Sequence, residues 1–150
     1  MPSKADSVMR RREGVFTCPL WKNKILLIWP DYAPDVPDLA GGGIDEGETE
    51  VAANEREFFE ETGFMVSFGQ MTPLQKFDQE VLFYADVQNE FWIYKQTYYL
   101  FDQNLDKIYF SGERDTPENG KMKWVNVEDI QNLPIHFMHQ KALKMFDLMG

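Results

Sequence analysis

The sequence has a single cysteine, Cys18, so it can form no internal disulfide, and a reducing compartment is expected. Basic residues are also few, because 15 Lys and Arg stand against 25 Asp and Glu, which gives a formal net charge of −10 at pH 7. This imbalance argues against long nucleic acids as partners, since a phosphate polymer needs a basic surface. Small phosphorylated ligands stay open, because a divalent cation can neutralise the acids of both molecules.

Long apolar runs are missing as well. No window approaches the roughly 18 apolar residues of a membrane-spanning helix, and residues 1–14 lack the apolar core of a secretory signal. These absences predict a cytoplasmic protein that does not enter a membrane. The chain does contain 43% hydrophobic and 15% aromatic residues over 150 positions, enough for a packed core. We therefore predict a single domain over residues 1–150, with residues 1–10 flexible.

Hydrophobic periodicity divides the chain into strands, a helix, further strands and a closing helix. This order predicts an α/β fold in which a mixed β-sheet is sandwiched between helices. A proline-rich run at 30–37 and a polar run at 111–120 indicate surface loops. The predicted helices span residues 49–62 and 136–148, and the predicted strands span 13–21, 24–30, 64–69, 80–87, 91–101 and 121–127.

The first predicted helix carries three acids at helical spacing. On a wheel of about 100° per residue, Glu57, Glu60 and Glu61 share one face at positions i, i+3 and i+4. Such neighbours have Cβ atoms about 5–6 Å apart, and like charges at that spacing repel. No lysine interrupts the cluster, and Arg56 lies at its edge. Either the face is a solvated acidic surface, or it holds a hard divalent cation such as Mg²⁺, which takes oxygen ligands.

The other side of the wheel predicts the contact with the core. Glu55 falls among its apolar positions, where an acid has no evident partner, and we find no role for it in the sequence. The residues predicted to face the core are Val51, Ala52, Phe58, Phe59 and Thr62.

The spacing of residues upstream decides between the two interpretations of the acids. Five residues separate Gly42 from Glu48, and seven more separate Glu48 from the run REFFEETGF, which begins at Arg56. This pattern resembles the signature of the Nudix hydrolases, G-x5-E-x7-R-E-U-x-E-E-x-G-U with U apolar, at nine specified positions in a window of 23 residues. The matching positions are Gly42, Glu48, Arg56, Glu57, Phe58, Glu60, Glu61, Gly63 and Phe64.

Two residues depart from the common form of the signature. Ala40 stands where many members have proline, and Asn54 stands where many have alanine. Neither position carries charge, so we expect altered packing and intact chemistry.

The resemblance implies a Nudix fold and a hydrolase that cleaves a nucleoside diphosphate linked to another group. It also implies Mg²⁺ or Mn²⁺ as cofactor, which would screen the phosphates and lower the pKa of a bound water. The implied metal-binding residues are Gly42 through its carbonyl, Glu57, Glu60 and Glu61, with Glu48 as an outer ligand or as a brace for Arg56.

The catalytic residues implied by the resemblance are Arg56, Glu57 and Glu60. Arg56 would orient a glutamate through a charge-assisted hydrogen bond. The general base stays open, because related enzymes use either a glutamate of the signature or a later acid. The alternatives in this chain are Glu57, Glu80, Glu113, Asp115 and Glu118.

The substrate is a nucleotide by resemblance, and the compact chain looks most like the small MutT-like nucleoside triphosphate pyrophosphatases. Gln79 stands where a proline would indicate ADP-ribose, and Val81 where a tyrosine would indicate dinucleoside polyphosphates. Hydrolysis of either compound stays an alternative, as does a non-catalytic nucleotide-binding Nudix domain, although the intact glutamates argue against the latter. A homodimer also stays open.

Overall fold

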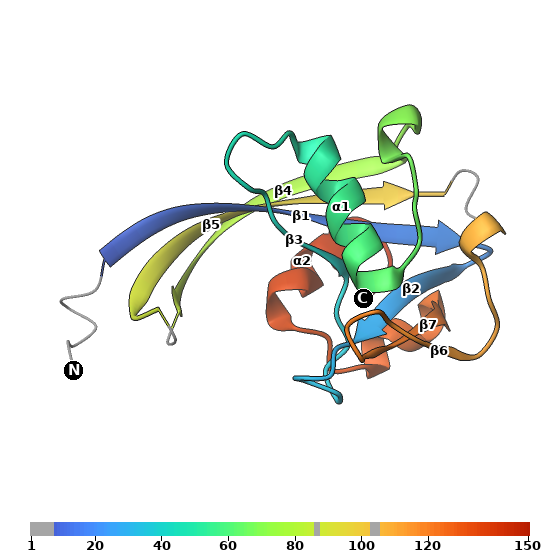
Figure 1. The fold of residues 1–150 in the computed structure, drawn as a ribbon. Helices are drawn as coiled ribbons and strands as arrows, with labels where there is room; N and C mark the ends of the chain where they lie inside the picture. The colour runs from blue at the N-terminus through green and yellow to red at the C-terminus, as the bar shows by residue number, and fades with distance from the viewer. Residues whose placement is uncertain (1–7, 86–87, 103–105) are drawn as a thin grey trace.

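The computed structural model describes residues 8–85, 88–102 and 106–150. Its strands form a seven-stranded sheet in the order β4-β5-β1-β2-β7-β6, with β3 paired to β1 (Figure 1). The strands are β1 (Val8–Trp21), β2 (Lys24–Trp29), β3 (Ala40–Gly43), β4 (Gln75–Ala85), β5 (Glu90–Phe101), β6 (Glu113–Asp115) and β7 (Lys121–Asn126). The helices are α1 (Glu50–Thr62) and α2 (Phe137–Met145), with 3₁₀ turns at Phe68–Gln70, Asp106–Ile108 and Val127–Asn132.

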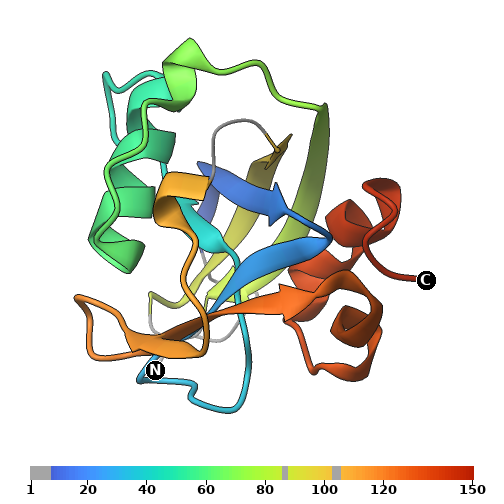
Figure 2. The same cartoon turned by 90° about the vertical axis from the view of Figure 1, so that its right-hand side faces the viewer.

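The sheet is mixed, as the sequence predicts. β1 runs parallel to β5 and antiparallel to β2 and β3. Figure 2 shows α1 and α2 on opposite sides of the sheet. The predicted α/β architecture, a mixed sheet between helices, is therefore confirmed. In the parts of the chain that the structure describes, no helix is long and apolar enough to cross a membrane.

The core has two layers because β2 is apolar on both faces. Successive side chains of a strand point to opposite faces of the sheet. Ile25 and Leu27 accordingly join the buried cluster that contains Leu143 of α2, whereas Leu26 joins the cluster that contains Phe58 of α1. The continuous apolar run of β2 thus anchors both helices.

Helix α1 begins and ends where the sequence predicts. The side chain of Thr49 accepts a hydrogen bond from the backbone N–H of Ala52, and this caps the first turn. Gly63 ends the helix in the left-handed conformation, with φ of 81°, and donates to the carbonyl of Phe59. These two caps fix the position of the acidic residues between them.

Other predicted bounds are wrong. Residues 64–69 form no strand, because Phe68 begins a 3₁₀ turn. The ring of Phe68 packs edge-on against the ring of Phe58, with 5.2 Å between the ring centres. The closing helix ends at Met145, since Asp147 takes a left-handed φ of 61°. β1 begins at Val8, inside the segment expected to be flexible, and residues 1–7 of that segment lie outside the described residues.

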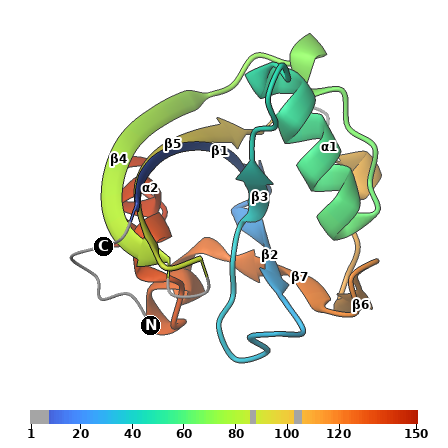
Figure 3. The same cartoon turned by 60° about the vertical axis from the view of Figure 1, so that its left-hand side comes forward.

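The early start of β1 lengthens the sheet on one side. Residues 8–13 pair with residues 90–95 of β5, and β5 pairs along its length with β4. Figure 3 shows these three strands curving together away from α1. This extension carries Arg10, Arg11 and Arg12 beside the loop that follows β3, because the N–H of Ile44 donates to the carbonyl of Glu13 at 2.9 Å.

Asn54 has a structural role that an alanine could not fill. It is buried in α1, and its side-chain oxygen accepts a hydrogen bond from the hydroxyl of Thr17 on β1, also buried. We expect Asn54→Ala to lower the free energy of unfolding by about 1–3 kcal/mol, because the Thr17 hydroxyl is left unpaired in the core. Chemical denaturation measures the change. The double variant Thr17→Val with Asn54→Ala should recover part of the loss, and wild-type stability of Asn54→Ala would contradict this role.

Candidate active site

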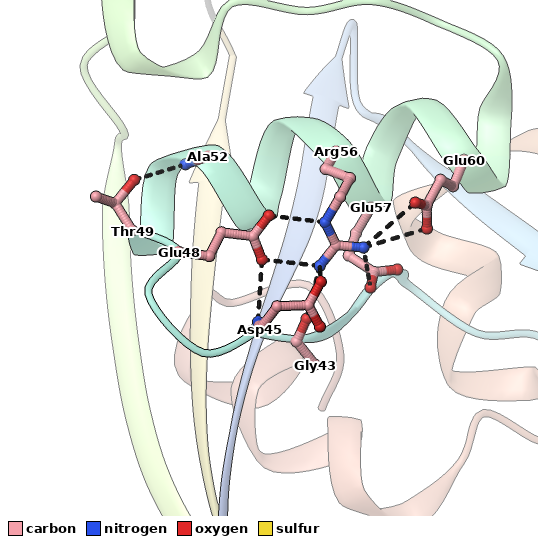
Figure 4. Close-up of polar contacts among 8 residues, drawn as sticks. All are labelled: Gly43, Asp45, Glu48, Thr49, Ala52, Arg56, Glu57 and Glu60. Atoms are coloured by element: carbon pink, nitrogen blue, oxygen red, sulfur yellow. Dashed lines mark hydrogen bonds and ion pairs between the residues drawn. The ribbon is translucent and has the colours of Figure 1, made fainter.

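Arg56 connects α1 to the loop before it. Its Nε and Nη2 atoms donate to the two carboxylate oxygens of Glu48 at 2.7 and 2.9 Å, and Nη2 also donates to the carbonyl of Gly43 at 3.0 Å. Its Nη1 atom donates to Glu57 at 3.0 Å (Figure 4). Paired hydrogen bonds between a guanidinium and a carboxylate fix both groups in orientation. Arg56 therefore sets the position of Glu57 relative to the β3 loop.

Glu48 is fully engaged in this connection. The hydrogen bonds from Arg56, followed by the one from the backbone N–H of Asp45, lower the pKa of Glu48 to about 2. The hydrogen bonds to Glu48, and then those to Glu57 and Glu60, raise the pKa of Arg56 above its ordinary value. Both carboxylate oxygens of Glu48 thus accept hydrogen bonds from Arg56.

Glu57 and Glu61 face the glycines of β3. A Cβ atom added to Gly42 would lie 2.7 Å from the Cδ and Oε2 atoms of Glu57, so only glycine allows this approach. The N–H of Gly41 donates to Oε2 of Glu61 at 2.9 Å. The carboxylates of one helix turn thus lie directly against the backbone of β3.

Both carboxylates are in surroundings that disfavour their negative charge. Burial raises the pKa of Glu57, and it raises the pKa of Glu61 to about 9 despite the hydrogen bond from Gly41. The charges of Asp38 and Glu118 add to the shift at Glu61. A cation bound between these acids would offset both the lost hydration and the mutual repulsion.

Glu60 lies apart from this pair. Its side chain is 48% exposed, and its oxygens lie 3.3 Å from Nη1 of Arg56. Within the described ranges, no three His, Cys, Asp or Glu side chains are grouped closely enough to hold a metal ion. The structure brings Glu57 and Glu61 together at β3 and directs Glu60 to Arg56.

The buried face of α1 differs from the predicted one. Phe59 is 48% exposed, and Val51 and Ala52 are exposed too. Asn54, Phe58 and Thr62 form one i, i+4 row of the helix and are buried. Glu57 and Glu61 belong to the neighbouring row, so they lie beside the buried positions and not opposite them. Glu55 lies with Phe59 at a surface hollow, away from β3. The residues of α1 that are buried are Ala53, Asn54, Phe58 and Thr62.

With this geometry in place, comparison with known proteins decides the family. The chain matches the NUDIX domain over residues 10–147, a span that includes the whole signature and both helices. The protein belongs to the Nudix family. It is accordingly a Nudix hydrolase domain, from an enzyme family that acts on pyrophosphate bonds. The search of curated proteins found no match.

Solved Nudix structures share the fold at low sequence identity. The E. coli dihydroneopterin triphosphate pyrophosphohydrolase is 18% identical, with a TM-score of 0.64 over 93% of this chain and 97% of that chain. A MutT Nudix hydrolase from Burkholderia pseudomallei is 24% identical, with a TM-score of 0.59 over 89% and 96%. The Ap4A hydrolase of C. elegans is 19% identical, with a TM-score of 0.61 over 91% and 95%. These proteins have different substrates, so the likeness shows the Nudix fold and leaves the substrate unresolved.

The later acids considered as general base are separated by the fold. Glu118 lines a hollow of about 140 Å³ together with Glu61. Glu80 lies on β4 and pairs with Arg11 at 3.5 Å. Glu113 and Asp115 are exposed on β6, where Asp115 pairs with Lys121. Of these four acids, Glu118 is the one that lies beside the Nudix glutamates.

A chain of polar groups beside the Nudix signature, running from partly exposed Asp38 to buried His139 and Tyr98, was not predicted. Nε2 of His139 lies 2.6 Å from Oδ1 of Asp38, and Nδ1 lies 2.6 Å from the hydroxyl of Tyr98. His139 is 2% exposed and belongs to α2. Asp38 stands close before the glycines in sequence, which could have marked it, but nothing local indicates its partner in α2.

Proposed function

We propose that this Nudix domain hydrolyses nucleoside triphosphates at a phosphoric anhydride bond and depends on Mg²⁺ or Mn²⁺. The observation that carries the proposal is the approach of Glu57 and Glu61 to the glycines of β3. Two partly buried carboxylates beside an accessible backbone form a site for a hard cation with oxygen ligands. A diphosphate needs such a cation, because it is itself strongly anionic.

The residues present fit a divalent ion. Glu57, Glu61 and the carbonyl of Gly42 would hold it, and Glu60 would join when its side chain leaves Arg56. When bound, the ion neutralises phosphate charge and lowers the pKa of a coordinated water. Glu48 acts through Arg56, which keeps the Glu57 carboxylate against Gly42. In the reaction, a water oxygen bonds to phosphorus, the anhydride oxygen leaves with the bonding electrons, and the water proton passes to a general base.

Glu118 is the general base that we infer from the contacts, since it shares a hollow with Glu61 whereas Glu57 is bound to Arg56. We expect Glu118→Gln to lower kcat by about 10²–10⁴-fold with little change in KM, because a general base contributes about that factor. Steady-state kinetics test this. Glu80→Gln is the matched control and should stay near wild type. Equal losses in the two variants would contradict the assignment.

The function is tested with a substrate panel. Nucleoside triphosphates, ADP-ribose and diadenosine tetraphosphate are incubated with the protein and Mg²⁺ or Mn²⁺, and the products are separated by ion-exchange chromatography. We expect nucleoside monophosphate and pyrophosphate from a triphosphate, and no product when the metal is chelated. Turnover of ADP-ribose or the dinucleotide alone would refute the triphosphate assignment. Saturable binding without any product would indicate the non-catalytic alternative.

A further inference from the structure

Two hollows meet at the glycines of β3. One has a volume of about 300 Å³ and is lined by Gly42, Phe16 and Asp38 among others. The second has a volume of about 470 Å³ and includes Gly43 and Arg12 in its lining. Tyr94 lines both, so the backbone that faces Glu57 lies between an aromatic hollow and one that carries arginine. We call them the aromatic hollow and the arginine hollow.

One face of β1 connects the two hollows. Arg12, Gly14 and Phe16 alternate along the strand and so point to the same side of the sheet. Gly14 lies under Tyr94, because a Cβ atom added there would be 2.7 Å from Cε1 of its ring. A ligand group extending from the β3 glycines in one direction reaches Phe16, and in the other direction it reaches Arg12.

Arg12 is held in place by a buried acid and an indole. Glu90 is 6% exposed, and its carboxylate accepts hydrogen bonds from Nε of Arg10 and Nε1 of Trp92, both at 2.6 Å. Nη2 of Arg12 lies 3.6 Å from the same carboxylate, and the Arg12 guanidinium lies 5.2 Å from the centre of the Trp92 ring. Stacking on an indole orients a guanidinium while leaving its N–H groups able to donate.

The charges around the arginine hollow are unevenly distributed. The loop after β3 carries Asp45 and Glu46, whereas β1 carries Arg11, Arg12 and Glu13. Among the described residues that line the two hollows, these two arginines are the only permanently cationic side chains. Arg11 is largely exposed and pairs with Glu80. Arg12, which stacks on Trp92, is therefore the cation of this hollow that is positioned to attract an anionic group.

We infer that Arg12 is a specificity-determining residue that binds an anionic group attached to the diphosphate, such as the terminal phosphate of a nucleoside triphosphate. The inference rests on the proposed function and deepens it. It explains how a chain with a net charge of −10 can favour a more highly charged substrate. A neutral sugar in the same position could accept hydrogen bonds from Arg12 but would gain no attraction between opposite charges.

The test uses inorganic tripolyphosphate with Mg²⁺, titrated calorimetrically into the full chain. We expect Arg12→Gln to weaken binding at least tenfold, Arg12→Lys to weaken it less, and higher salt to reduce the difference. Arg114→Gln is the control with the same change of charge, because Arg114 also stacks on an aromatic ring, 4.6 Å from the centre of Phe110, and lines neither hollow. Thermal unfolding shows that each variant is folded.

The same variants are then compared on ATP and ADP-ribose, which share the ADP group. We expect Arg12→Gln to lower the ratio of kcat/KM for ATP to that for ADP-ribose at least tenfold. Wild-type binding of tripolyphosphate by Arg12→Gln, or no binding by the wild type, would overturn the inference even if triphosphates are hydrolysed. Arg12-dependent binding without turnover of any nucleotide would instead support the inference and refute the proposed function.

Discussion

Glu57→Gln is expected to reduce kcat at least a hundredfold while the protein stays folded. The amide keeps the shape of the side chain but loses the negative charge that would bind the cation. Burial already raises the pKa of Glu57, so removing this charge should cost little stability. Steady-state kinetics with saturating Mg²⁺ measure the loss, and circular dichroism with thermal unfolding measures the fold.

Glu55→Gln is the matched control for this variant. Glu55 belongs to the same helix and undergoes the same chemical change, but it lies at the hollow formed with Phe59 and Met65, away from β3. We expect its kcat to stay near that of the wild type. If Glu57→Gln retained wild-type turnover, or if both variants lost it equally, the assignment of Glu57 to the metal site would fail.

Gly42→Ala is the second variant with a large expected effect. The new methyl group would lie 2.7 Å from the Glu57 carboxylate, so that carboxylate must move. Misplacing a catalytic group by about 1 Å can cost about a hundredfold in rate, and we expect a loss of that order in kcat. The displaced atoms are the end of a flexible side chain, so the free energy of unfolding should change little.

Gly43→Ala separates steric displacement from a general effect of alanine in β3. A Cβ atom added to Gly43 has no heavy atom within 4 Å. We expect its kcat to fall much less than that of Gly42→Ala under the same assay. Similar losses in both variants would show that a methyl group is harmful at either glycine, and the specific contact between Gly42 and Glu57 would not account for the loss.

The sequence was sufficient for the parts of the site that depend on local spacing. All nine positions of the Nudix signature lie within 23 residues, from Gly42 on β3 to Phe64 just beyond α1. Helix caps such as Thr49 and Gly63 act on neighbouring residues, so the bounds of α1 could be predicted. The pairing of Glu48 with Arg56 is local too, because only Thr49 and the first turns of α1 separate the two residues.

The helical wheel predicted the buried face of α1 less reliably, because it assumes that a single apolar stripe of the helix packs against the core. Phe59 was predicted to be buried and is exposed, whereas Asn54 is buried against Thr17. The angle at which a helix meets a sheet depends on residues of other elements. Here the close approach of α1 to β3 is possible because Gly42 has no side chain.

The sequence by itself determined the Nudix family, the α/β class and the glutamates of the signature that we propose bind the cation. Only the tertiary structure decided which distant residues join them: Glu118 beside Glu61, His139 against Asp38, and Arg12 over Trp92. The physical reason is one of range. Helical spacing and capping act over a few residues, whereas these contacts arise from strand pairing and helix docking between segments far apart in the chain.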